Sequence, residues 1–89
     1  MTTRVHAVVR GRVQGVGFRY ATARLAEEAG VAGYVRNRPD GAVEAEVEGP
    51  DDAVARVADF LRSGPRGAHV TGAEVRAVAP RGEHGFAVR

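Results

Sequence analysis

Apolar and polar positions alternate along several short stretches of the chain, as β-strands require. Residues 4–10 are rich in β-branched side chains and predict a first strand. Residues 31–38 and 42–48 predict a second and a third strand, which a Pro-Asp-Gly turn joins into a hairpin. Residues 70–78 predict a fourth strand, and residues 86–89 predict a short edge strand.

Two segments between these strands have helical character. Residues 18–29 are rich in Ala, Leu, Arg and Glu, and Gly30 supplies a stop signal. The apolar face expected for this helix consists of Phe18, Ala21, Leu25 and Ala29. The second helix opens at Pro50-Asp51-Asp52, where acidic side chains suit the positive end of the helix dipole. Its expected apolar stripe consists of Val54, Val57, Ala58 and Leu61.

The predicted order of elements is βαββαβ, with a possible short fifth strand at the C-terminal end. Two amphipathic helices bury their stripes together only against one face of a sheet. The fold class expected is therefore α+β, a ferredoxin-like two-layer sandwich with an antiparallel sheet and both helices on one face. We expect residues 1–89 to form a single domain. The third strand's row of Glu44, Glu46 and Glu48 is expected to face solvent.

Composition excludes several classes of site. The chain has no cysteine, which rules out disulfides, thiolate metal sites and cysteine nucleophiles. All 13 basic residues are arginine, so Schiff-base and Walker-loop lysines are excluded too. The net charge of +2 is too small to indicate nucleic acid. Apolar runs are too short to span a membrane, and the first residues lack the apolar core of a signal peptide, so a cytoplasmic protein is expected.

The segment after the first strand holds the most informative chemistry. Residues 11–17 contain three glycines and lead into a predicted helix. Glycines there let successive N–H groups converge on one point, and a helix N-terminus adds unpaired N–H groups. Arg19 adds a guanidinium that can bind two phosphate oxygens. The glycine pattern alone leaves two interpretations with equal weight, an anion cradle and a tight turn with an exposed arginine. The segment matches neither a Walker loop nor a dinucleotide fingerprint.

Residues 11–19, Gly-Arg-Val-Gln-Gly-Val-Gly-Phe-Arg, resemble a signature of the acylphosphatase family. Residues 33–41, Gly-Tyr-Val-Arg-Asn-Arg-Pro-Asp-Gly, resemble the second signature of that family. The resemblance extends over nearly the whole chain. It implies an enzyme that hydrolyses the carboxyl–phosphate bond of acyl phosphates to a carboxylate and inorganic phosphate, without metal or other cofactor.

The resemblance also implies roles for particular residues. It places the phosphate-binding loop at the backbone of Gln14, Gly15, Val16, Gly17 and Phe18. Arg19 matches the family's phosphate-binding arginine, and Asn37 matches the asparagine that holds the attacking water. Ala42 stands where many members have Ser or Thr, so a supporting hydroxyl is expected to be missing. Tyr34 replaces a frequent Trp, with an expected effect on packing alone.

The partners expected are a small acyl phosphate and a phosphate or sulfate ion at the loop, with no nucleic acid, no membrane and a monomeric chain. No residue pattern defines an acyl pocket. An RNA-binding module is the alternative from another class, but neither the first nor the third strand offers an aromatic side chain for stacking. A regulatory or accessory domain that binds the anion without turnover is a third reading.

The remaining candidates have simpler interpretations. His6, His69 and His84 show no metal-ligand spacing, so no metal site is expected. Arg36 and Arg38 flank Asn37 on the opposite strand face and are expected to be solvated surface charges.

Overall fold

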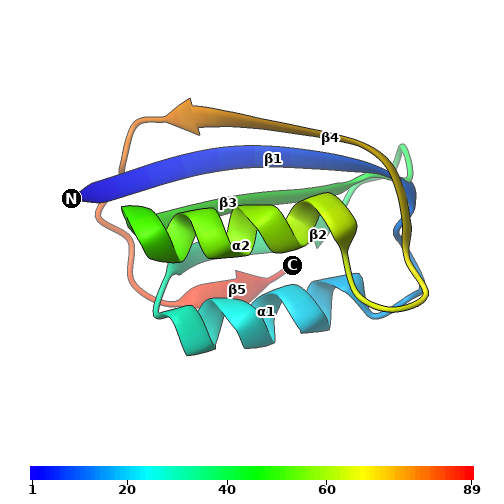
Figure 1. The fold of residues 1–89 in the computed structure, drawn as a ribbon, viewed down its shortest axis with the longest axis horizontal. Coiled ribbons are helices and arrows are strands. Elements are labelled where there is room, and N and C mark those ends of the chain that lie inside the picture. The colour runs from blue at the N-terminus through cyan, green and yellow to red at the C-terminus, as the bar shows by residue number, and fades with distance from the viewer.

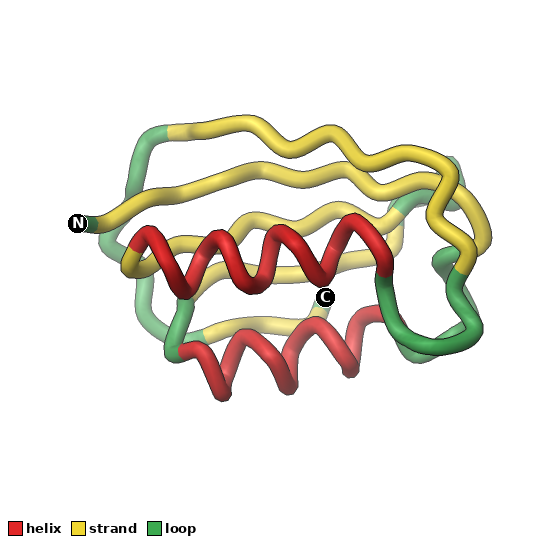
Figure 2. The backbone as a smooth tube through the Cα atoms, in the orientation of Figure 1, coloured by secondary structure: helices red, strands yellow, loops and turns green.

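The computed structural model describes all 89 residues as one five-stranded sheet with two helices (Figures 1 and 2). The elements are β1 (Thr2–Arg12), α1 (Phe18–Ala29), β2 (Ala32–Asn37), β3 (Val43–Pro50), α2 (Asp51–Ser63), β4 (His69–Val78) and β5 (Phe86–Val88). Both helices cover the same face of the sheet, with α2 on β1 and β3 and α1 on β2 and β5. The predicted ferredoxin-like sandwich is confirmed.

The strand order is β4-β1-β3-β2-β5, and one detail of the predicted sheet is wrong. The first four strands pair antiparallel, whereas β5 pairs with β2 in parallel, so the sheet is mixed. The connection of residues 79–85 passes along one end of the sheet from β4 to the opposite edge (Figure 1). Therefore β5 starts at the end where β2 also starts, and the two run in the same direction.

The core lies between the sheet and the two helices. Its β3 residues are Val43, Ala45 and Val47, the predicted inward face. The predicted stripe of α2 is buried in full, at Val54, Val57, Ala58 and Leu61. The fully buried residues of α1 are Phe18, Thr22 and Ala26. The predicted stripe of α1 was therefore partly wrong, because Ala21, Leu25 and Ala29 are only half-buried. Thr22 is tolerated in the core because its hydroxyl donates a 2.8 Å hydrogen bond to the Phe18 carbonyl.

Two of the three carboxylates in the β3 row are buried and that of Glu44 is half-buried, which contradicts the expected solvent-exposed face. Glu46 is 9% exposed and Glu48 is 5% exposed. Arg4 lies opposite Glu48 in the β1–β3 register and is 1% exposed. Its Nε donates to Glu46 Oε1 at 2.6 Å, and its Nη1 donates to Glu48 Oε1 at 3.0 Å. A buried cation on the neighbouring strand thus forms ion pairs with both buried carboxylates.

The β4–β5 connection adds further contacts to this ionic network, which consists of Arg4, Glu46, Glu48 and Glu83. The Glu48 carboxylate accepts hydrogen bonds from the main-chain N–H groups of Arg81 (2.6 Å) and Gly82 (2.8 Å). Glu83 Oε1 lies 2.7 Å from Arg4 Nη2, an ion pair whose angle does not meet hydrogen-bond geometry.

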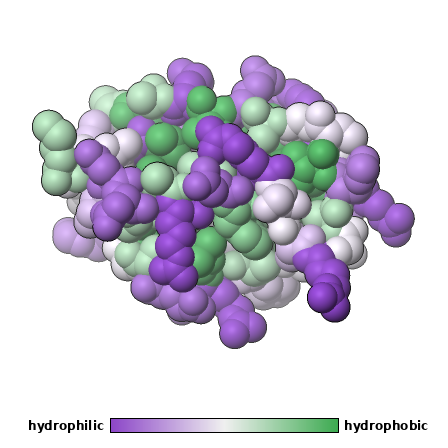
Figure 3. Space-filling view, in the orientation of Figure 1, coloured by the Kyte–Doolittle hydropathy of each residue, from purple (hydrophilic) through white to green (hydrophobic).

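Figure 3 shows the opposite, helix-bearing side, where hydrophilic side chains extend over smaller apolar patches.

These contacts shift the acidity of the two carboxyl groups downward. The main-chain hydrogen bond from Arg81, helped by Arg4, outweighs burial and lowers the pKa of Glu48. Burial acts to raise the pKa of Glu46, but the hydrogen bond and charge of Arg4 outweigh it, so this pKa also lies below its ordinary value. Both side chains are therefore held as carboxylates at neutral pH.

Candidate active site

The loop between β1 and α1 contains two glycines in the left-handed conformation. Gly15 has φ 76° and Gly17 has φ 78°, both in the left-handed region that favours glycine. Such left-handed residues, alternating with ordinary ones, turn successive N–H groups toward one concave point. Gly17 caps α1 without any side-chain hydrogen bond, and the first turn of α1 carries no acidic residue. The positive end of α1 is thus left open to an anion.

A cavity of about 200 Å³ opens at this loop. It is lined by Val13, Gly15, Gly17, Phe18, Arg19, Tyr20 and Asn37. Asn37 is the last residue of β2 and pairs with Val43, whose side chain is in the core. Strand register therefore places Asn37 on the helix-bearing face, at the end where α1 begins. The two residues that the sequence resemblance singled out, Arg19 and Asn37, line one cavity although they are far apart in the chain.

Arg19 is held by the far end of the chain. Its Nη1 donates a 3.0 Å hydrogen bond to the main-chain oxygen of Arg89. Arg89 itself donates from its N–H to the Val35 carbonyl at 2.8 Å, continuing the β2–β5 pairing. Sequence reasoning missed this partner, because nothing in the residues themselves shows that β5 runs parallel to β2.

Gln14 connects the loop to the hairpin that carries Asn37. Its Nε2 donates to the carbonyl of Arg38 at 2.8 Å and to the carbonyl of Ala42 at 3.0 Å. The Ala42 carbonyl also accepts from the Arg38 N–H at 2.8 Å. Gln14 was predicted to contribute its backbone to the loop, and the structure adds this bridging role for its side chain. Neither Gln14 nor Val16 lines the cavity, and Val16 packs against the core.

The β2–β3 turn is stabilised by a hydrogen bond from the main chain of Ala42 to the side chain of Asp40. Ala42 is 2% exposed, so the position without a hydroxyl is closely packed. Its N–H donates to Asp40 Oδ1 at 3.1 Å. This hydrogen bond, with the charges of Arg38 and Arg10, holds the pKa of Asp40 below its ordinary value. Asp40 therefore stays ionised as a fixed acceptor in the turn.

Tyr34 does more than fill space, which is all that the sequence led us to expect. Its hydroxyl donates to Glu46 Oε2 at 3.3 Å, and the Arg89 guanidinium lies 4.2 Å from the centre of its ring. Burial, followed by the negative charges of Glu44 and Glu46, raises the pKa of the Tyr34 hydroxyl. Tyr34 thus connects the ionic network to the residue that holds Arg19.

Other candidates from the sequence lie outside the cavity. His6 Nε2 lies 2.7 Å from Glu44 Oε2, and neither residue lines the cavity. Arg36 pairs with Glu44, and Arg38 lies 3.0 Å from Asp40, so these partly exposed arginines carry surface charge as expected and also form ion pairs. No group of three or more His, Cys, Asp or Glu side chains is placed to hold a metal ion. At 12 and 13 residues, α1 and α2 are both too short to be membrane-spanning helices.

Fold and cavity together define a small ferredoxin-like sandwich whose glycine-rich loop borders a cavity at the start of α1. A sequence model of the acylphosphatase family matches residues 5–88. The chain is 49% identical to an acylphosphatase of Nocardioides sp., covering 100% of this chain and 90% of the relative. It is 57% identical to an acylphosphatase of Nitrobacter hamburgensis, over 85% of this chain and 77% of the relative. The structure matches the acylphosphatase of Bacillus subtilis with a TM-score of 0.93 and 37% identity, covering 100% and 99% of the two chains.

The chain belongs to the acylphosphatase family. It is thereby an enzyme whose activity is the hydrolysis of acyl phosphates, as the sequence resemblance implied.

Proposed function

We propose that acyl phosphates are hydrolysed in the cavity at the start of α1, with the phosphoryl group bound by the loop and by Arg19. The observation that carries this proposal is that Arg19 and Asn37 line the same cavity of about 200 Å³ as Gly15 and Gly17. The backbone N–H groups of residues 14–18 and the guanidinium of Arg19 are the donors proposed for the phosphoryl oxygens. The same donors would bind the product, inorganic phosphate, or a sulfate ion.

An acyl phosphate is a mixed anhydride, and its hydrolysis needs few catalytic groups. Water attacks phosphorus, the bond from phosphorus to the bridging oxygen breaks, and a carboxylate leaves with the electron pair. A carboxylate departs without a proton, so no general acid is needed. The proton of the water passes to a phosphoryl oxygen. The protein must therefore bind the phosphoryl group, stabilise its charge and position the water in line.

Asn37 is proposed to position that water. Its carboxamide has one acceptor oxygen and two donor hydrogens, so it fixes a water without taking its proton. It reaches the cavity from β2, whereas the phosphate donors come from the loop and from α1. Separate elements would thus position the attacking water and bind the phosphoryl group.

The test is a kinetic comparison of three variants with the wild type. We expect Asn37→Ala to lower kcat at least a hundredfold, about 3 kcal/mol, with phosphate still bound as a competitive inhibitor. Arg19→Ala should lose both turnover and phosphate inhibition. Arg19→Lys should also fail, because an ammonium cannot replace the planar two-pronged guanidinium. Arg24→Lys, an exposed position on the same helix and outside this cavity, is the matched control.

The outcomes separate the proposal from the alternatives. A kcat near the wild-type value for Asn37→Ala would refute the positioning of water by that residue. Phosphate binding without release of phosphate from any acyl phosphate would favour an accessory domain that only binds the anion. We also propose that the chain acts as a monomer, which sedimentation at the enzyme concentration of the assay tests.

A further inference from the structure

One aromatic side chain at the cavity is not used by the proposed reaction. Three large apolar residues of the chain are exposed, Met1 (99%), Tyr20 (71%) and Val88 (41%). Of these, Tyr20 alone lines the cavity. An isolated exposed apolar residue is ordinary on a protein surface, but one that borders a binding cavity offers a contact for a ligand.

Tyr20 also provides the accessible apolar surface of this cavity. The other two apolar lining residues are Val13, which is 1% exposed, and Phe18, which is 2% exposed. Both belong to the core and have no free area for a substrate. The rest of the lining consists of two glycines, Arg19 and Asn37.

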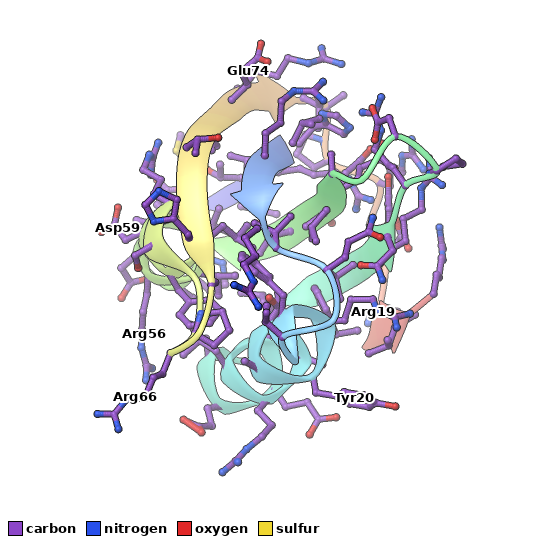
Figure 4. The ribbon with its side chains drawn as sticks, turned by 90° about the vertical axis from the view of Figure 1, so that its right-hand side faces the viewer. Arg19, Tyr20, Arg56, Asp59, Arg66 and Glu74 are labelled. Atoms are coloured by element: carbon purple, nitrogen blue, oxygen red, sulfur yellow. The ribbon has the colours of Figure 1, made fainter.

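The direction of the reaction determines where the acyl group must lie. In-line attack places the leaving oxygen on the side of phosphorus opposite to the water. Asn37 approaches from β2, while Tyr20 belongs to the first turn of α1, directly after Arg19. Figure 4 shows Arg19 and Tyr20 projecting from the start of α1 toward the same side of the molecule. An acyl group that leaves on the side away from Asn37 and toward α1 would meet Tyr20, the exposed side chain of that helix at the cavity.

We propose that the ring of Tyr20 forms the acyl subsite and favours acyl phosphates whose acyl group is aromatic or otherwise flat and apolar. This inference rests on the proposed function of the cavity. An offset or edge-on contact between two aromatic rings contributes beyond simple burial, and its magnitude corresponds to roughly two- to tenfold in binding. Acetyl phosphate has only a methyl group to offer and gains little from the ring.

The experiment measures kcat and KM for benzoyl phosphate and acetyl phosphate with the wild type, Tyr20→Ala and Tyr20→Phe. Comparing the ratio of the two kcat/KM values across variants cancels the different intrinsic reactivities of the substrates. We expect Tyr20→Ala to lower the benzoyl-to-acetyl ratio about two- to tenfold, mainly through the KM for benzoyl phosphate. Tyr20→Phe keeps the ring and should retain the wild-type ratio. Glu27→Ala, an exposed change elsewhere on α1, is the control.

The possible results are distinct. An unchanged ratio in Tyr20→Ala overturns the acyl subsite while the proposed function stands. Equal losses for both substrates also overturn it, because they place the effect of Tyr20 on phosphate binding or on the fold. Release of phosphate from neither substrate by the wild type overturns the proposed function itself, and the acyl subsite with it.

Discussion

Replacement of Arg4 by methionine tests whether the ionic network beneath the sheet stabilises the fold. Methionine keeps an unbranched apolar stem and fills most of the packing volume, but it removes the cation. Arg4 has a fully buried side chain and contacts three carboxylates, those of Glu46, Glu48 and Glu83. Deleting one partner of a buried ion pair costs about 3–5 kcal/mol, because the remaining charge stays buried without compensation.

The remaining contacts of these carboxylates favour the lower end of that range. Glu48 keeps its two main-chain donors, and Glu46 keeps the hydroxyl of Tyr34. The side chain of Glu83 is 33% exposed and can turn to water. We therefore expect Arg4→Met to lower the free energy of unfolding by about 3 kcal/mol. For a domain of 89 residues this is a large share of a total of about 4–13 kcal/mol, and it lowers Tm by roughly 12–24 °C.

The effect of Arg4→Met on the free energy of unfolding should also depend on pH. Glu46 and Glu48 have pKa values below the ordinary value of 4.5 in the folded chain. Groups with a lowered folded pKa stabilise the fold above about pH 4.5, and that contribution is lost as the pH falls through the folded pKa. Wild-type stability should therefore decline below about pH 4.5. The gap between the wild type and Arg4→Met should shrink over the same range, since the buried carboxylates of the variant become protonated.

The assay is urea unfolding followed by circular dichroism at pH 7 and at several values below pH 4.5. Arg76→Met, an exposed change opposite His6 on the same sheet face, is the matched control and should stay within about 0.5 kcal/mol of the wild type. Adding Glu46→Gln to Arg4→Met should recover part of the loss. A loss below about 1 kcal/mol at pH 7, or an equal loss in acid, would show that Arg4 contributes packing and not charge compensation.

Three further changes test the loop and the reaction. Gly17→Ala should lower the free energy of unfolding in urea by about 1–2 kcal/mol, because φ is 78° at this position and no heavy atom lies within 4 Å of the added methyl group. An unchanged stability would contradict the left-handed conformation of Gly17. Gln14→Leu should lower the free energy of unfolding by about 1–2 kcal/mol and reduce kcat, because the carbonyls of Arg38 and Ala42 lose a donor. An unaltered kcat would show that the hydrogen bonds from Gln14 to the hairpin do not position the loop. Activity toward an acyl phosphate should persist after treatment with a chelator, since donors of the chain suffice for the reaction; a loss restored by added metal would refute the metal-free mechanism.

The elements of this fold were readable from local patterns. Strict alternation marked residues 42–48 as a strand, and helical spacing marked the buried stripe of α2. The glycines around Gln14 and Val16 marked the loop, because positive φ at Gly15 and Gly17 favours glycine over other residues. Arg19 and Asn37 were found through their two signatures, and their roles stay predictions.

Alternation reveals that a strand has two faces but does not show what covers each one. Glutamates on one face of β3 are typical of a solvent-exposed surface, and here that expectation was wrong. Arg4 reaches them only because the β1–β3 register places it opposite Glu48, and the connection after β4 brings main-chain donors to the same carboxylate. The cover is made of segments distant in sequence, which local periodicity does not contain.

By itself the sequence determined the order of helices and strands, the glycine-rich loop before α1, and the residue types available for phosphate chemistry, since each depends on neighbours within a few positions. Only the tertiary structure decided that Asn37 and Arg19 line one cavity, that Arg89 holds Arg19, and that Glu46 and Glu48 are buried. Those features depend on strand register and on the direction of β5. Both are set by how distant segments pair, after the entropy of bringing them together is offset by a shared core.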